Sequence, residues 1–164
     1  MQTDFLDLIL VRHAKSDWNN NLRDHDRPLN KRGRNDAPFM GKIIADKFGE
    51  IDLILSSSAV RAYITAEIFA DELNYKKQIQ VEPNLYLTGT REFLRALEKY
   101  GKSNKSVMVF AHNPGISQFA NYLCHKFTNG MPTAAIAHFQ IPVDAWNMIT
   151  QNSAILKEYL YPKM

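Results

Sequence analysis

LILVRHAKSDWN, residues 8–19, joins four apolar residues directly to a cation and an imidazole. The short apolar run, β-branched in part, predicts a buried strand over residues 6–12. Arg12 and His13 then stand at the carboxyl end of that strand. In open α/β sheets, ligands bind outside the carboxyl ends of the strands. The pair therefore either sits at a strand end by chance or is placed there to meet an anion.

Apolar strand patterns alternate with helical patterns along the rest of the chain. Strands are predicted over 6–12, 51–57, 78–83 and 106–112, helices over 30–48, 58–74, 90–100 and from 116 to 127, and a closing hairpin from 134–141 and 154–161. Between the first strand and the first helix, polar residues 16–28 predict a long loop. The alternation predicts an α/β fold: a three-layer α/β/α sandwich with a mostly parallel central sheet and an antiparallel edge.

Two residues bear on the bounds of the first predicted helix. Pro38 falls within 30–48, and proline is tolerated in the first turn of a helix, so the helix proper is expected to begin near it. Gly49 is expected to stop the same helix.

Length and composition are typical of a globular protein. The 164 residues predict a single domain, and the hydrophobic fraction of 45% and charged fraction of 23% are ordinary. Cys124, the only cysteine, cannot form an internal disulfide, which favours a cytoplasmic setting. Asp4 and Asp7 stand where a signal peptide would be basic, and no apolar run reaches the length of a membrane span.

The net charge of +3 does not favour a nucleic-acid-binding protein. The clearest basic cluster is RPLNKRGR, residues 27–34. A solvated helix start explains this cluster about as well as a binding patch does.

Two further strand ends carry the same kind of residue as the first. Arg61 follows the second buried strand, and His112 follows the third, so three strands deliver two arginines and two histidines to one edge of the sheet. Ser58 is a candidate N-cap, which would put Arg61 at the third helical position. A cation is unfavourable there by about 0.3–1 kcal/mol unless an anion lies beside it.

The segment after His112 also predicts a helix start that would face an anion. Asn113 is a candidate N-cap with Pro114 at the first helical position, which would leave free N–H groups facing an anion. Taken singly, each of these residues has a structural interpretation, and their agreement in sheet position favours the functional one.

Metal and nucleotide sites have little support. His13 and His112 fit no metal-binding spacing, and the neighbouring arginines would repel a dication. His25, His125 and His138 are interpreted as structural or solvated. Neither GxxxxGK[ST] nor GxGxxG occurs in the sequence. No metal and no cofactor are expected.

Several motifs occur in the order found in one family. LVRHAKSDW with DHDRPLNKRG, then SSSAVRAYITAEIFA, then FAHNPG, resemble the histidine phosphatase superfamily, which has the phosphoglycerate-mutase-like fold. The RHA variant, the short length and the HNPG form resemble the SixA-like phosphohistidine phosphatases. The resemblance covers about residues 6–125.

The resemblance implies roles for individual residues. His13 matches the nucleophile that becomes phosphorylated, Arg12 and Arg61 match the arginines that bind the phosphoryl group, and His112 matches the second histidine of the pocket. Asn19, in the SDWN segment, matches a position that lines the phosphate site in longer relatives. Asn113 is a further candidate for substrate binding. Nearby cations should keep His13 neutral near pH 7, as a nucleophile must be.

One departure from the family concerns the proton donor. Relatives that act on phosphate esters carry an acid in the segment that here reads VEPNLYLTGTREF, where Asn84 and Leu87 stand at positions that often hold Glu. Glu82 and Glu92 are the nearby acids, and neither matches the family position well. A phosphoramidate needs this proton less than an ester does, so the expected substrate is protein phosphohistidine.

Three alternatives remain open at this point. The chain could be a small phosphomonoesterase that uses Glu82 or Glu92, a phosphate-binding module without turnover, or, less in keeping with its charge, a nucleic-acid-binding protein through residues 27–34. Trp18 and Tyr86 could line the mouth of the pocket or be packing residues. The expected partners are a phosphorylated protein and inorganic phosphate, without nucleic acid or membrane, and the chain is expected to be a monomer or a weak dimer.

Overall fold

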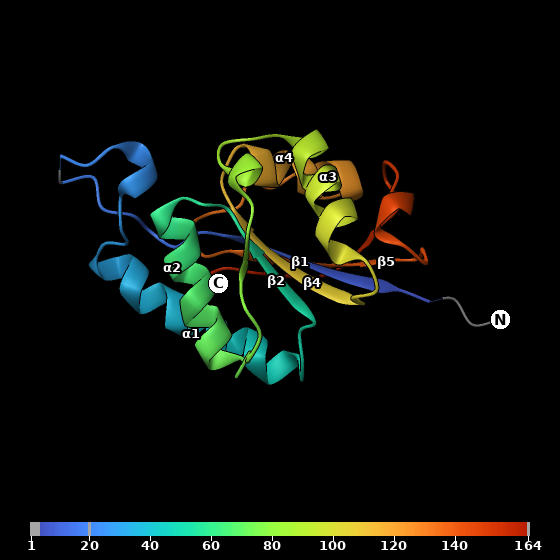
Figure 1. Ribbon diagram of the computed structural model, residues 1–164, viewed down its shortest axis with the longest axis horizontal. Helices are drawn as coiled ribbons and strands as arrows, with labels where there is room; N and C mark the ends of the chain where they lie inside the picture. The colour runs from blue at the N-terminus through green and yellow to red at the C-terminus, as the bar shows by residue number, and fades with distance from the viewer. Residues whose placement is uncertain (1–3, 20, 164) are drawn as a thin grey trace.

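The strand that ends in Arg12 lies in the middle of the sheet. In the computed structural model, which describes residues 4–19 and 21–163, six strands are arranged in the order β3-β2-β4-β1-β5-β6 (Figure 1). The strands are β1 (Leu6–Arg12), β2 (Leu53–Ser56), β3 (Gln80–Val81), β4 (Ser106–Ala111), β5 (Ile136–Ile141) and β6 (Ile155–Leu160). The pairs β1–β4, β4–β2 and β2–β3 are parallel, whereas β5 is antiparallel to both of its neighbours. The predicted mixed sheet is confirmed.

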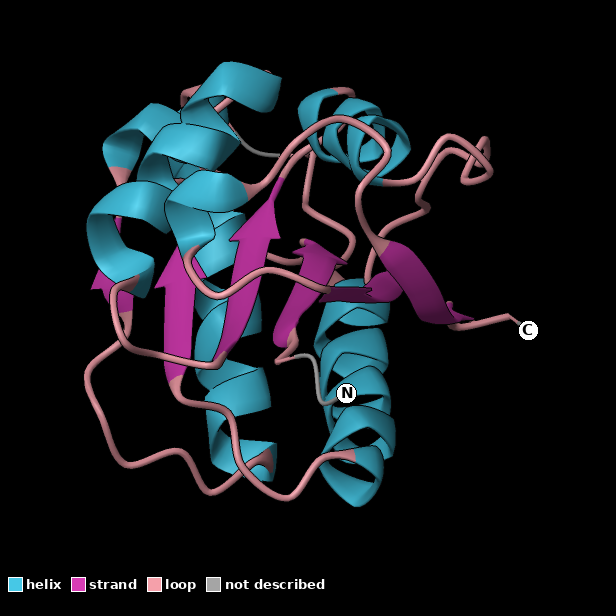
Figure 2. Cartoon of the chain, turned by 90° about the vertical axis from the view of Figure 1, so that its right-hand side faces the viewer, coloured by secondary structure: helices cyan, strands magenta, loops and turns pink. Residues whose placement is uncertain are grey.

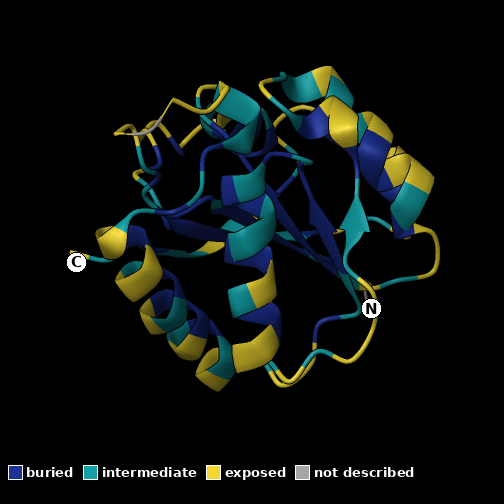
Figure 3. Ribbon diagram, turned by 60° about the vertical axis from the view of Figure 1, so that its left-hand side comes forward, coloured by how far each residue is buried: buried dark blue, intermediate teal, exposed yellow. Residues whose placement is uncertain are grey.

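Helices cover both faces of this sheet. The helices α1 (Lys31–Lys47) and α2 (Val60–Glu72) lie on one face, and α3 (Thr90–Gly101) and α4 (Gly115–Leu123) lie on the other (Figures 1 and 2). Successive side chains of β1 alternate between the two layers, because Leu8 and Leu10 belong to the core under α3 and α4, whereas Ile9 and Val11 belong to the core under α1 and α2. Figure 3 shows the strands buried between the layers. The structure therefore has the expected three-layer α/β/α architecture.

The first helix has the predicted bounds to within one residue, but its end and the place of its proline differ from the prediction. Asn30 is the N-cap, since its side chain accepts a hydrogen bond from the Gly33 N–H, and Phe48, not Gly49, is the C-cap. Pro38 lies inside the helix, so the expectation that the helix begins near this proline is wrong. A proline inside a helix removes one backbone hydrogen bond. The fully buried Ala37 and Met40 on either side of it show that the packing of this face holds the helix together.

Three other elements are shorter than predicted. The strand expected over 78–83 has two residues, because Glu82 already caps the short helix η2 (Pro83–Leu85). Helix α4 ends at Leu123, and Phe127 lies beyond it but is still buried in the same core. Ala134 has φ of 64°, so the strand predicted over 134–141 begins at Ile136.

The long segment between β1 and α1 is folded onto the body of the protein. Ser16 and Leu29 form an isolated antiparallel bridge that closes the segment at its base. Within it, the short helix η1 (Asp24–Asp26) contacts α2. Residue 20 of the predicted loop 16–28 lies outside the described residues. The segment thus brings polar side chains over the carboxyl end of β1.

The last helical element is also short. A third short helix, η3 (Trp146–Met148), packs against α3. Within residues 4–19 and 21–163, none of the helices combines the length and the apolar character that a membrane crossing requires.

Candidate active site

Four residues predicted from the strand ends line one pocket. Arg12 ends β1, His13 follows it, Arg61 lies in the first turn of α2, and His112 directly follows β4. Because β1, β2 and β4 are parallel neighbours, their carboxyl ends meet at one edge of the sheet. The ring centroids of His13 and His112 are 5.1 Å apart.

His13 is buried and held in one tautomer. Its Nδ1 lies 2.7 Å from the carbonyl oxygen of Ala14. A carbonyl can only accept, so Nδ1 carries the hydrogen and the lone pair of the neutral ring is on Nε2. Burial, together with the positive charges of Arg61 and Arg12, lowers the pKa of His13 to about 3, although the bond to Ala14 acts in the opposite direction. The ring is therefore neutral, with a free nucleophilic nitrogen, at physiological pH.

His112 is oriented by a serine that sequence reasoning did not single out. Its Nε2 lies 2.8 Å from the Ser57 hydroxyl, and that hydroxyl accepts a hydrogen bond from the Ala59 N–H. When Ser57 donates its own proton to Nε2, Nδ1 of His112 becomes a donor. Burial and the nearby His13 lower the pKa of His112 well below its usual range, so this ring is also neutral.

Arg61 is placed differently from the expectation. The N-cap of α2 is Ala59, not Ser58, so Arg61 is the second helical residue; the Ser58 hydroxyl lies 2.9 Å from a ring nitrogen of His25 instead. The anion beside Arg61 belongs to the chain itself. One terminal nitrogen of Arg61 donates to the Asp24 carbonyl (2.6 Å) and the other to the Asp24 carboxylate (3.0 Å).

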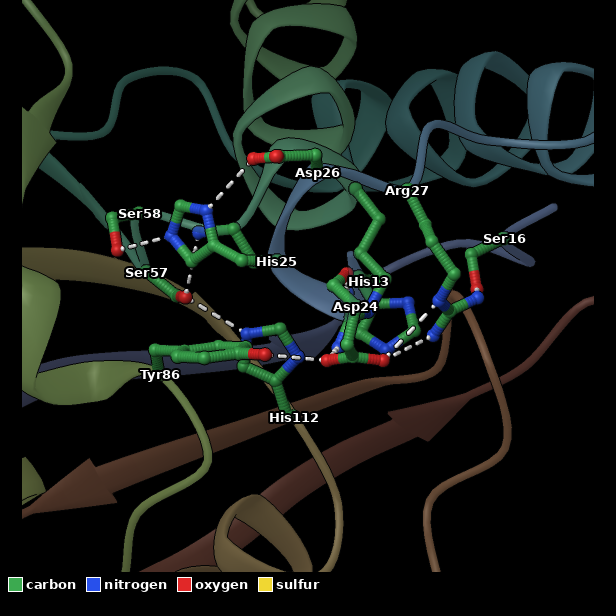
Figure 4. Close-up of polar contacts among 12 residues, drawn as sticks. His13, Ser16, Asp24, His25, Asp26, Arg27, Ser57, Ser58, Tyr86 and His112 are labelled. Carbon is green, nitrogen blue, oxygen red and sulfur yellow. Dashed lines mark hydrogen bonds and ion pairs between the residues drawn. The ribbon is translucent and has the colours of Figure 1, made fainter. Parts of the chain in front are cut away.

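Asp24 is the functional candidate that sequence reasoning missed. Its carboxylate also accepts hydrogen bonds from Tyr86 (2.5 Å) and Arg27 (2.9 Å), and Figure 4 shows it between the rings of His13, Tyr86 and His112. The bond from Tyr86, followed by those from Arg27 and Arg61, holds the pKa of Asp24 far below its usual range. The two aspartates of the segment DHDRP, residues 24–28, were the available signal, but the pattern alone does not distinguish them from a solvated loop.

Three buried nitrogen atoms in this pocket have no hydrogen-bond partner. They are Nε of Arg12, Nε of Arg61 and Nδ1 of His112, and across the described part of the chain they are the only buried side-chain nitrogen or oxygen atoms without one. Buried polar groups are almost always paired, since an unpaired one costs about 1–3 kcal/mol. All three can donate a hydrogen bond, and all three belong to residues that line the same pocket.

Other predicted residues lie at the edge of the pocket or away from it. Asn113 lines the pocket, but it is not a helix cap: its side chain donates to the Met131 carbonyl and accepts from Ser117, and Pro114 precedes the first helical residue. Asn19 is exposed and is not among the residues that line the pocket.

The two acids proposed as proton donors lie in a different place. The Glu82 carboxylate accepts hydrogen bonds from the Asn84 N–H (2.8 Å) and the Tyr100 hydroxyl (3.0 Å). With Glu92 it lines a separate cavity beside α3. Neither carboxylate lines the pocket that contains His13.

The basic cluster 27–34 is divided by the fold. Arg27 is buried and donates to the Ser16 hydroxyl at 2.6 Å, whereas Lys31, Arg32 and Arg34 are exposed on α1. Its first arginine therefore belongs to the pocket and not to a solvated helix start. Among residues 4–19 and 21–163, no group of three or more histidine, cysteine or acidic side chains is placed to hold a metal ion.

Comparisons with known proteins identify a matching family. The family model of the histidine phosphatase superfamily, branch 1, matches residues 8–86, which include Arg12, His13, Asp24 and Arg61. The chain therefore matches the histidine phosphatase superfamily over this stretch, and it resembles two SixA structures over 96% of its length.

Two solved structures and one sequence relative illustrate this similarity. A structure described as the phosphohistidine phosphatase SixA of Agrobacterium tumefaciens is 26% identical, with a TM-score of 0.80 over 96% of this chain and 98% of that one. The protein histidine phosphatase SixA complexed with tungstate is 25% identical, with a TM-score of 0.78 over 96% of this chain and 97% of that one. An uncharacterized chloroplast protein of Arabidopsis thaliana is 35% identical over 71% of this chain, which spans 58% of that protein.

The lowered pKa values predict how the two histidines respond to acid. We expect the imidazoles of His13 and His112 to keep the nuclear magnetic resonance shifts of neutral rings from pH 7.5 down to about pH 5. Because the unfolded chain binds these protons near the ordinary pKa of about 6.5, the free energy of unfolding should fall as pH drops below that value toward the pKa of about 3 of His13. Half-protonation of either ring near pH 6.5 would contradict the site as described.

The pairing of Asp24 predicts a stability change that phosphate reverses. Asp24→Ala leaves the buried Arg27 and Arg61 without their carboxylate, which should lower the free energy of unfolding by about 2 kcal/mol in oxyanion-free buffer. Millimolar phosphate should then stabilise the variant more than the wild type, since it replaces the lost counter-charge. The matched control is Asp36→Ala, which breaks a surface pair with Arg32 and should cost no more than about 0.5 kcal/mol. Equal urea midpoints for the two variants would refute this account.

Proposed function

We propose that this protein is a phosphatase that acts through a phosphohistidine intermediate on His13 and that its substrate is protein phosphohistidine. The observation that carries the proposal is the set of three unpaired buried donors beside a neutral histidine. Binding of an anion requires only the donors and the positive charge. A histidine kept neutral, with its tautomer fixed, is what nucleophilic attack requires.

Binding of the phosphoryl group follows from the donors. Arg12 and Arg61 would donate through their free Nε atoms and His112 through Nδ1 to the phosphoryl oxygens. Charge-assisted bonds of this kind are about twice as strong as neutral ones. They also stabilise the charge that the equatorial oxygens carry in the transition state. Side chains supply all of this charge, so the proposed reaction uses no metal ion and no cofactor.

The reaction then proceeds in two steps. The lone pair on Nε2 of His13 attacks phosphorus, the bond from phosphorus to the substrate's imidazole nitrogen breaks, and that nitrogen takes a proton from solvent. Water next attacks the phosphorus on His13. The P–Nε2 bond breaks, inorganic phosphate leaves, and the neutral ring is restored with Nδ1 still donating to Ala14.

The leaving group decides between a phosphoramidate and a phosphate ester. An alkoxide must be protonated as it leaves, and a positioned acid is worth about 10²- to 10⁴-fold in rate. Asp24 is the carboxyl group that lines the pocket, but its lowered pKa keeps it ionised, and Glu82 and Glu92 lie elsewhere. An imidazole leaving group can be protonated by solvent. The pocket therefore suits phosphohistidine better than phosphoserine.

A small phosphomonoesterase of the same superfamily is the second candidate. The presence of Asp24 in the pocket favours it, since a substrate that displaced the Tyr86 hydrogen bond could raise the pKa of this carboxyl group. Ester turnover would then depend on Asp24 and not on Glu82 or Glu92.

Phosphate release from two substrates separates these candidates. We expect a phosphohistidine protein to be hydrolysed at least about 10²-fold faster, in kcat/KM, than a phosphoserine peptide. His13→Ala should abolish both activities, after subtraction of the spontaneous hydrolysis of the phosphoramidate. Comparable turnover of the ester would support the phosphomonoesterase. No turnover of either, with phosphate still bound, would leave a binding module.

A further inference from the structure

Two large apolar side chains are exposed at the mouth of the active-site pocket. Trp18 is 68% exposed and Leu87 is 56% exposed, and both line the pocket that contains His13. They come from segments far apart in the sequence: Trp18 follows β1, and Leu87 lies between η2 and α3. The interior of the same pocket is lined by arginines and histidines, so the apolar residues are confined to the rim.

Trp18 is held by a contact beneath its ring. The guanidinium carbon of Arg27 lies 3.4 Å from the ring centroid of Trp18. Arg27 is itself buried and is fixed by its hydrogen bonds to Ser16 and Asp24. A cation stacked on an indole face at this distance is attractive, so the ring is anchored although it is exposed.

Leu87 is held by its backbone. Its φ is 49°, a conformation that non-glycine residues seldom adopt. The residues on either side are fixed: the Tyr86 ring packs edge-on against His112, and the Thr88 carbonyl lies so close to Gly115 that a Cβ there would collide with it. The leucine is therefore presented to solvent in a strained conformation that its neighbours maintain, a combination typical of functional sites.

We propose that Trp18 and Leu87 bind apolar residues that flank the phosphorylated side chain of a protein substrate. This inference rests on the proposed function, because the proposed function places the phosphoryl group on the floor of the pocket. Whatever is attached to that group must then leave through the mouth and pass both side chains. Preformed, rigid apolar groups bind at low entropic cost, and aromatic residues often dominate such contacts. The rim thus selects a polypeptide with apolar neighbours over a small phosphorylated metabolite.

The test uses stable ligands so that binding is measured apart from turnover. Two peptides carry a non-hydrolysable phosphonate analogue of phosphohistidine, one flanked by leucines and the other by serines. The wild type should bind the leucine peptide about tenfold more tightly, as measured by fluorescence anisotropy. Leu87→Asn removes the apolar side chain but keeps a residue that tolerates positive φ, and should reduce this preference to less than about twofold. Trp18→Ala should do the same.

Two controls keep the result specific. Phe39→Ala removes an equally exposed apolar side chain from α1, outside the pocket, and should leave the preference intact. Turnover of phosphoimidazole, which has no flanking residues, should also be unchanged in Phe39→Ala. A preference that is absent in the wild type, or that survives in both rim variants, would overturn the inference.

The same variants give different results if the rim binds something other than a peptide or if the proposed function is wrong. Binding to phosphatidylglycerol vesicles that both rim variants lose would assign the rim to a membrane surface and refute the inference. Dimerisation abolished by the same variants would assign it to a second copy of the chain. Failure of His13-dependent phosphoimidazole turnover would overturn the proposed function, whereas the peptide preference would still report on the rim.

Discussion

The pairing of two buried arginines with one carboxylate is the interaction on which the rest of the site depends. Arg27 and Arg61 are 5% and 3% exposed, and an unpaired buried charge is costly. Asp24 pairs with both, and Tyr86 donates a further hydrogen bond to it. This one carboxylate therefore ties the segment after β1 to the start of α2 and to the segment before α3.

Arg12 and Arg61 each have hydrogen-bond donors that the protein does not use, and a ligand could accept from these donors. Asp24 engages the terminal nitrogens of Arg61, and Met131 accepts a bond from a terminal nitrogen of Arg12, while both Nε atoms stay free. The positive charge close to His13 also favours the neutral form of its ring. In the proposed reaction, Arg12 and Arg61 would therefore both bind the phosphoryl group and favour the neutral form of His13.

The strand ends were predictable from the sequence because they follow from local patterns. A short apolar run marks β1 and another marks β4, and the parallel arrangement of an α/β sheet brings the residues after them together, which placed Arg12, His13 and His112 in one pocket. Arg61 followed from its unfavourable charge near a helix start, although its cap is Ala59 and not Ser58.

The rest of the site was not predictable because it depends on tertiary contacts. Nothing local distinguishes Asp24 from Asp26, and only the fold of the segment after β1 turns the first toward Arg61 and leaves the second paired with the exposed Arg23. The environment of Glu82 also depends on tertiary contacts, and the sequence alone left this residue open as one of two acids that an esterase could use. Its burial against Tyr100 gives it a structural partner instead.

The central claim is that Nε2 of His13 carries the phosphoryl group during turnover. The most direct measurement is to quench the protein in alkali during hydrolysis of a phosphohistidine substrate and to locate the phosphoryl group by mass spectrometry and phosphorus nuclear magnetic resonance. The account predicts a phosphoryl group on His13, bonded to Nε2, since Nδ1 donates to the Ala14 carbonyl. A phosphoryl group on another residue, or on Nδ1, or none at all during continuing turnover would contradict it.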